Sequence, residues 1–319
     1  MADIVQTAPF PAVRVAWRPG RAWGKALRGH LPASECAWAA AFCVPYAGIF
    51  LAFMVYPIAY GIWMGSDPEL YRRLFADPLY VKAATNTALY VGLTINVKML
   101  LALALSGLFM RRGWAYKALL MIFVLPWAMP AWPAFMSIHW MLNGEWGLIN
   151  NFLWDVFGID GPHWLTVDWL AFGAVMLSHL WKALPFSTVI LLAGRMAIPT
   201  DIVEAAKVDG ATGWRMFAHV TFPLIGNLYL IATLLSTIFT LGDFNTVNFV
   251  SGGGPANSTH VLATLSIKYM NDLFQPQMGV AAALSALPVM VPGRHPDAQV
   301  ADAIGATMTR SARSGPPRV

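Results

Sequence analysis

Long apolar runs, each near or above the length that crosses a lipid bilayer, recur throughout this sequence of 319 residues. A helix that spans a membrane needs about 20 predominantly apolar residues. Composition agrees, because hydrophobic residues make up 57% of the chain and charged residues only 12%. The sequence therefore predicts an all-α integral membrane protein, a polytopic bundle of about six transmembrane helices.

The predicted spans differ in how regular they are. The third contains Pro126, Pro130 and Pro133, which predict kinks or a broken helix whose freed carbonyls neighbouring protein must satisfy. The last holds only 14 apolar or small residues, about 21 Å of helix against a hydrocarbon core of about 30 Å. The expected ranges are 38–64, 84–110, 118–142, 169–192, 224–250 and 278–291.

Positive charges predict which side of the membrane each connecting segment faces. Arg111 and Arg112 follow the second span and the N-terminal tail is rich in arginine, so both are expected in the cytoplasm. The segments 65–82 and 143–168 are expected to be loops, and the second must lie outside because it has no lysine or arginine. The expected parts are a cytoplasmic tail (1–34), a transmembrane domain (35–291) and an atypical polar tail (292–319), for which a frameshift is one hypothesis.

A polar segment, 198–223, separates the fourth and fifth spans and carries the signals of two short helices. The first helix is expected to open with a capping box between Asp201 and Glu204 and to stop at Gly210. The second has apolar residues at helical spacing and is expected to end at Pro223. The segment therefore predicts a helix, a glycine turn and another helix.

Within this segment the run Glu204-Ala205-Ala206 is followed by Asp209-Gly210-Ala211 and a final proline. The pattern resembles the EAA loop of permease subunits in binding-protein-dependent ABC importers, and the second run favours the maltose-type, sugar-importing branch. Val220 and Phe222 depart from the usual isoleucine and leucine. In that family the loop is a cytoplasmic helix-turn-helix that sits in a groove of the ATPase. The resemblance assigns this coupling role to Glu204, Ala205, Ala206, Asp209, Gly210 and Pro223.

The residue types suit such a contact on physical grounds as well. Two alanines on a surface helix let another protein approach closely, and the carboxylate of Glu204 offers an acceptor to a charged donor across the contact. The alternative is that Glu204 only caps its own helix.

Polar residues inside the apolar runs are few, and the most informative are on spans four and five, which flank the polar segment. On span five, Ser236, Thr240 and Asp243 are expected to share one helical face. In maltose-type relatives the sugar contacts fall on the same two helices, so the resemblance implies a substrate path. An aromatic face and groups that bond sugar hydroxyls are what such a site needs. The alternative is that the hydroxyls only hold helices together and that the charged groups pair with a partner subunit. The candidates are His179, Phe186, Ser236, Thr240 and Asp243.

The chain has no phosphate-binding loop, no hydrolase motif and no metal-ligand cluster among its seven histidines, which argues against an enzyme. Energy must then come from another polypeptide. The resemblance implies a multi-pass subunit of the bacterial cytoplasmic (inner) membrane, with no cofactor of its own. The implied partners are a second permease in a heterodimer, an ATPase dimer that binds ATP and magnesium, and a periplasmic or extracellular sugar-binding protein. Nucleic acid is not expected, because the basic residues cluster at the ends of spans.

Two other functions remain open at this point. A stand-alone secondary transporter or channel is one, although such proteins are expected to show paired ionisable groups or an inverted repeat. A non-functional, truncated permease is the other, because the last span is short. The sequence does not name the sugar.

Overall fold

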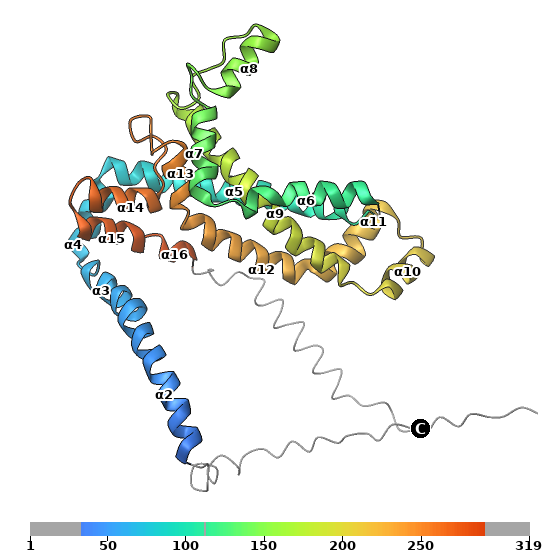
Figure 1. Ribbon diagram of the computed structural model, residues 1–319, viewed down its shortest axis with the longest axis horizontal. Helices are drawn as coiled ribbons and strands as arrows, with labels where there is room; N and C mark the ends of the chain where they lie inside the picture. The colour runs from blue at the N-terminus through green and yellow to red at the C-terminus, as the bar shows by residue number, and fades with distance from the viewer. Residues whose placement is uncertain (1–32, 112, 291–319) are drawn as a thin grey trace, which may run out of the picture. The chain divides into compact units, whose positions relative to one another are not determined.

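The computed structural model describes residues 33–111 and 113–290, and the predicted tails 1–34 and 292–319 lie almost wholly outside these ranges. Every regular element in the described ranges is a helix, as Figure 1 shows. The all-α prediction is therefore confirmed for this part of the chain. The chain divides after Gly61 into two units, which are described separately.

The first unit is a single rod of helix that continues a short way beyond Gly61. It consists of α2 (Ala33–Phe50), the π-helical turn η1 (Leu51–Val55) and α3 (Tyr56–Met64). The stretch Phe42–Met64 is apolar and long enough to cross a membrane, in agreement with the first predicted span. Its aromatic side chains stack one turn apart, as Trp38 does on Phe42.

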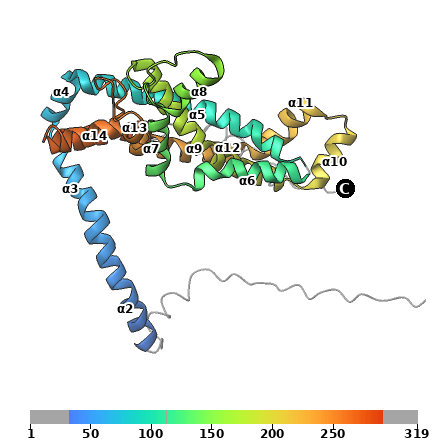
Figure 2. The ribbon, with the colours of Figure 1, turned by 45° about the horizontal axis from the view of Figure 1, so that its top comes forward.

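Long helices form the body of the second unit, and they lie side by side in both views (Figures 1 and 2). Helix α9 packs against each of the other three. Among the described residues four helices can cross a membrane, or five if the bent pair counts as one span, so the structure supports fewer crossings than the six predicted. The long helices are α5 (Pro78–Phe109), α6 (Trp114–Ala128), α9 (Asp168–Met196) and α12 (Phe222–Leu241).

The third predicted span is broken, as its prolines predict. Helix α6 is followed by α7 (Ala131–Met141), and the two axes are bent by 97°. An α-helix bonds each N–H to the carbonyl four residues earlier, and Pro130 and Pro133 have no N–H. The carbonyls of Pro126 and Met129 are the ones that these prolines leave without a helical partner.

The predicted loop 65–82 is mostly helical, so that expectation is wrong. It contains α4 (Pro68–Ala76) and the start of α5. The side chain of Asp67 accepts a hydrogen bond from Glu69 N at 2.9 Å, and the side chain of Asp77 accepts one from Leu79 N at 2.8 Å. An aspartate N-cap followed by proline at the first helical position is a strong start signal, and it occurs twice here.

The predicted outer loop 143–168 also contains a helix, α8 (Leu148–Phe157). Asn150 fixes the fold of this loop. Its side chain donates to the carbonyl of Gly144 at 2.8 Å and accepts from the indole of Trp164 at 2.7 Å. The segment is therefore a small folded unit built around one buried amide.

The fifth predicted span is wrong at both ends. Pro223 does not end a helix, because α11 (Gly213–Met216), the π-helical turn η2 (Phe217–Thr221) and α12 run on as one rod, with Pro223 in the first turn of α12. The π turn widens the backbone where proline cannot donate a hydrogen bond. At the other end α12 stops at Leu241, and a separate helix, α13 (Phe244–Val250), follows.

The last part of the described chain forms three short helices rather than one span. The first two pack with α4 and the first turns of α5 around Leu74, Leu265 and Tyr269, all fully buried. No helix in the described part of 278–291 is long enough to cross a membrane. The three are α14 (Leu262–Asn271), α15 (Pro276–Leu284) and α16 (Leu287–Met290).

Candidate functional site

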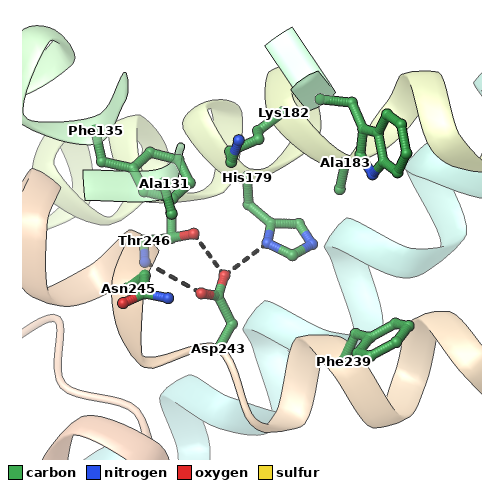
Figure 3. Close-up of a pocket in the computed structure, with 10 residues that line it drawn as sticks. Ala131, Phe135, His179, Lys182, Ala183, Phe239, Asp243, Asn245 and Thr246 are labelled. Atoms are coloured by element: carbon green, nitrogen blue, oxygen red, sulfur yellow. Dashed lines mark hydrogen bonds and ion pairs between the residues drawn. The ribbon is translucent and has the colours of Figure 1, made fainter. Parts of the chain in front are cut away.

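Two adjoining cavities lie between the long helices of the second unit. The first, drawn in Figure 3, has a volume of about 230 Å³ and the second about 350 Å³. Trp127, His179, Ala183 and Phe239 line both. Together they fall in the size range of ligand pockets, about 300–1,000 Å³. The structure brings all five candidates of the predicted substrate path to these walls: Asp243 to the first, Phe186, Ser236 and Thr240 to the second, and His179 to both.

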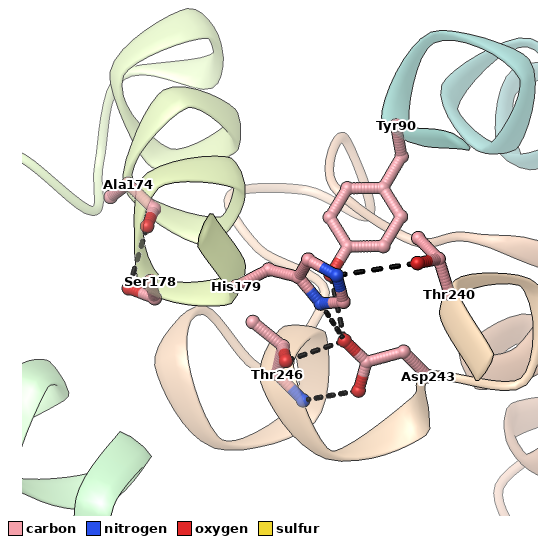
Figure 4. Close-up of polar contacts among 7 residues, drawn as sticks. All are labelled: Tyr90, Ala174, Ser178, His179, Thr240, Asp243 and Thr246. Carbon is pink, nitrogen blue, oxygen red and sulfur yellow. Dashed lines mark hydrogen bonds and ion pairs between the residues drawn. The ribbon is translucent and has the colours of Figure 1, made fainter. Parts of the chain in front are cut away.

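Asp243 is the centre of the polar network beside the first cavity (Figure 4). Its Oδ2 accepts from the hydroxyl of Tyr90 at 2.7 Å, from Nδ1 of His179 at 2.7 Å and from the hydroxyl of Thr246 at 2.5 Å. Its Oδ1 accepts from the backbone N–H of Thr246 at 3.1 Å. One carboxylate thus joins α5, α9 and the start of α13.

Asp243 reaches this place because it caps a helix, not because it lies on one. It is the N-cap of α13, and Gly242 and Asp243 form the break after α12. The predicted shared helical face of Ser236, Thr240 and Asp243 therefore holds only for the first two. Thr240 and Asp243 are still linked through His179 on α9, whereas Ser236 lines the second cavity only.

His179 continues the network from Asp243 toward α12. Its Nδ1 faces a carboxylate oxygen, which only accepts, so Nδ1 carries a proton. Its Nε2 lies 3.3 Å from the hydroxyl of Thr240. The imidazole therefore links the carboxylate on one side with a hydroxyl that lines the second cavity.

The aromatic wall of the cavities comes from two helices. The rings of Trp127 on α6 and Phe186 on α9 stack with centroids 5.5 Å apart and planes 16° from parallel. Lys182, one turn before Phe186 on α9, donates to the carbonyls of Pro126 at 3.1 Å and Met129 at 2.6 Å. These are the carbonyls that lack a helical partner because of Pro130 and Pro133. Lys182 therefore supplies the missing hydrogen-bond donors at the break between α6 and α7.

Sequence reasoning missed several residues of the site. Tyr90 and Lys98 lie on α5 and Trp127 on α6, helices to which no site residue had been assigned, whereas Thr246 lies within the predicted fifth span but was not chosen. A signal was present on α5, where Asn86, Tyr90, Thr94 and Lys98 recur at helical spacing within an apolar run. Among residues 33–111 and 113–290, no cluster of three histidine, cysteine or acidic side chains is placed to hold a metal ion.

The segment that resembles the EAA loop lies at one end of the long helices, as α10 (Thr200–Val208) and α11 (Figure 1). Gly210 ends α10 with a φ of +78°, and Ala211 N donates to the carbonyl of Ala206 at 2.9 Å, so the predicted glycine stop is confirmed. The predicted capping box is wrong, because the helix begins after Pro199 without a side-chain cap.

The face of α10 is open. Glu204 and Ala205 are exposed, Ala206 is half-buried, and Val208 is 88% exposed. Within the described chain the carboxylate of Glu204 makes no hydrogen bond or ion pair. The interpretation that Glu204 caps its own helix therefore has no contact to support it.

Comparison with known proteins places this chain in a family. The family of binding-protein-dependent transport system inner membrane components matches residues 98–294. The trehalose/maltose transport system permease MalF of Thermococcus litoralis is 27% identical over 76% of this chain and 86% of its own length. The sulfoquinovosyl glycerol transport system permease SmoG of Agrobacterium fabrum is 31% identical over 69% of this chain and 70% of its own.

The fold agrees with a solved transporter. A chain of the bacterial alginate ABC transporter, crystallised with an alginate-bound periplasmic protein, superposes with a TM-score of 0.75 at 21% identity, over 88% of this chain and 98% of that one. The family match and this fold agree with the multi-pass helical architecture. The chain belongs to the family of inner membrane components of binding-protein-dependent transport systems.

Proposed function

We propose that this chain is one membrane subunit of an ABC importer and that its substrate is a carbohydrate. The observation that carries the proposal is the pair of cavities, with the stacked rings of Trp127 and Phe186 on one wall and hydroxyls on another. Aromatic faces pack against sugar rings, and hydroxyl and carboxylate groups bond sugar hydroxyls. Relatives named for the transport of trehalose/maltose, lactose and sulfoquinovosyl glycerol support a glycoside.

Transport is driven by a separate ATPase subunit that docks on α10. The exposed carboxylate of Glu204 beside two alanines and the tight turn at Gly210 are the features that support this contact. ATP and magnesium are bound by that partner, so this chain is non-catalytic. Glu204, Ala205, Ala206, Asp209, Gly210 and Pro223 form the coupling segment, of which Pro223 belongs to the first turn of α12 rather than to the docked surface.

The complete importer also contains a second permease and a substrate-binding protein outside the membrane. The acidic segment that holds α8, free of lysine and arginine, faces outward, while α10 and the N-terminus face the cytoplasm. His179, Phe186, Ser236, Thr240 and Asp243 then lie along the path between the two sides.

Replacing Glu204 with lysine tests this proposal. Reversal of its charge is expected to abolish sugar uptake by the assembled transporter while the chain still inserts and binds the second permease. Asp201→Lys is the matched control, since it makes the same charge change one turn earlier on an exposed position of α10. Uptake that is unchanged in the Glu204→Lys transporter would contradict the coupling role.

Co-purification separates the remaining alternatives. An ATPase that purifies with the wild-type chain is expected, whereas a stand-alone carrier or channel would move substrate without one. A truncated remnant would fail to assemble with any partner.

A further inference from the structure

Three polar side chains line the second cavity without a hydrogen-bond partner among the described residues. Lys98 on α5, Ser187 on α9 and Ser236 on α12 all line it. Their exposed fractions are 3%, 2% and 7%, yet among the described residues none of the three side chains makes a hydrogen bond or an ion pair. Their polar atoms are not among the fully enclosed unpaired atoms of the described residues, so they face the space of the cavity, where a ligand or water is the partner left to them.

The lack of a hydrogen-bond partner among the described residues costs the most free energy at Lys98, because its side chain is charged. An ammonium taken out of water needs an acceptor or an opposite charge. Asp243 acts on it electrostatically, but both carboxylate oxygens of Asp243 are occupied by Tyr90, His179 and Thr246. Lys98 is therefore left as a donor that points to the cavity without an acceptor.

The charges around the two cavities do not balance. Among the described residues, their walls contain two lysines, Lys98 and Lys182, against one carboxylate, that of Asp243. Lys182 is committed to the two carbonyls at the helix break, which carry no charge. A ligand that brings one negative charge would restore the balance, and Lys98 is the free cation that it would meet.

We propose that the second cavity binds an acidic carbohydrate, and that Lys98 with Ser187 and Ser236 holds its negatively charged group. One ammonium and two hydroxyls that converge from three helices are the donor set that carboxylate, sulfonate or phosphate oxygens require. The stacked rings of Trp127 and Phe186 cover the apolar face of the same ligand. This inference rests on the proposed function and names its substrate class.

Substrate selection by the whole transporter tests the inference. The complete complex, with its ATPase and binding protein, is reconstituted into vesicles and given neutral mono- and disaccharides beside the matching uronic acids and sulfonated sugars. The wild type is expected to import an acidic member in preference to its neutral counterpart. In the Lys98→Met transporter, uptake of that sugar is expected to fall by about tenfold.

Controls separate recognition from assembly. Lys98→Arg keeps the charge and is expected to retain most uptake. Lys82→Met removes an exposed lysine from the same helix and is expected to change nothing. ATP hydrolysis by the Lys98→Met complex without substrate is expected to match the wild type, because Lys98 lines a cavity to which α10 contributes no residue.

Each other outcome overturns the inference. Import of neutral sugars only, or a Lys98→Met transporter that matches the wild type on acidic sugars, refutes the acidic substrate and leaves the proposed importer standing. Neutral-sugar preference combined with loss of the second permease from Lys98→Met preparations would assign Lys98 to a carboxylate of that partner. Import of no sugar at all by an assembled, ATP-hydrolysing complex would remove the proposed function as well.

Discussion

The Nδ1 atom of His179 lies 2.7 Å from Oδ2 of Asp243, although 64 residues separate them in the chain. His179 is in the middle of α9, whereas Asp243 stands at the break after α12 and caps α13. The contact therefore fixes the end of one helix and the start of another against a third. The same carboxylate supports the fold and borders the first cavity, so one substitution tests both.

Replacing Asp243 with asparagine is expected to destabilise the protein and to reduce uptake. The amide has one accepting oxygen and no charge, so it does not serve all the donors that Tyr90, His179 and Thr246 present. The expected loss in free energy of unfolding is about 1.5–3 kcal/mol, as for other hydrogen bonds to a charged group. Thermal unfolding of the purified complex in detergent measures it.

The matched control is Asp155→Asn on the exposed face of α8, which is expected to leave stability unchanged. If Asp243→Asn unfolds at the wild-type temperature, the network does not hold these helices together.

Lys182 is expected to stabilise the broken helix rather than to choose the substrate. Lys182→Met would leave the part-buried carbonyl of Pro126 without a donor, at a cost of about 1 kcal/mol, whereas the carbonyl of Met129 is exposed and is left to bond water. The variant should therefore unfold at a lower temperature and keep its preference among sugars. Lys117→Met on the exposed side of α6 is the control. A change in preference at unchanged stability would move Lys182 to the binding site.

Much of the membrane architecture follows from the sequence, because long apolar runs and proline are strong local signals. The break at Met129 and Pro130 and the stop at Gly210 both depend on the chemistry of single residues. Polar residues in spans are rare, and two that were selected by type, His179 and Ser236, line the same cavity.

The site residues and helix ends that were not predicted from the sequence depend on how the helices pack against one another. Tyr90 becomes a candidate site residue only because α5 packs against α9, and Trp127 only because α6 packs against the same helix. The end of α12 was misplaced because Asp243 was counted as part of a helical face, whereas its side chain caps the next helix. The aspartate–proline pairs that start α4 and α5 predict helix starts, but segment 65–82 was assigned as a loop because it lacks a long apolar run.

Gly210 is expected to be needed for its backbone conformation. Its φ of +78° is one that residues with a Cβ rarely adopt, and nothing lies within 4 Å of the position where a Cβ would stand. Gly210→Ala should therefore be strained by about 1 kcal/mol without any clash, which would shift α10 and lower the uptake supported by each ATP. Gly210→Asn is expected to retain more uptake, because asparagine tolerates this region. Equal activity of both variants would indicate that the turn is not under conformational constraint.

Acid is expected to destabilise the region around His260, which precedes α14. Burial first, and then the charge of Lys268, lower the pKa of His260 from 6.5 to about 4, while Asp272 raises it. The folded state thus favours neutral His260, which also contacts the hydroxyl of Thr264 at 3.1 Å. The unfolded state binds the extra proton first, so stability from this group is complete above its ordinary pKa of 6.5 and is lost as pH falls toward 4.

Comparing wild type with His260→Gln isolates this group from others that titrate in the same range. Unfolding temperatures at about pH 7.5 and about pH 5 give a difference for each protein. The fall in unfolding temperature between the two pH values is expected to be smaller in His260→Gln, because glutamine has no proton to gain at this position. The variant is expected to be less stable than the wild type at both pH values. Identical differences would mean that His260 is protonated as easily in the folded protein as in the unfolded chain, and that the neutral ring is not what α14 packs against.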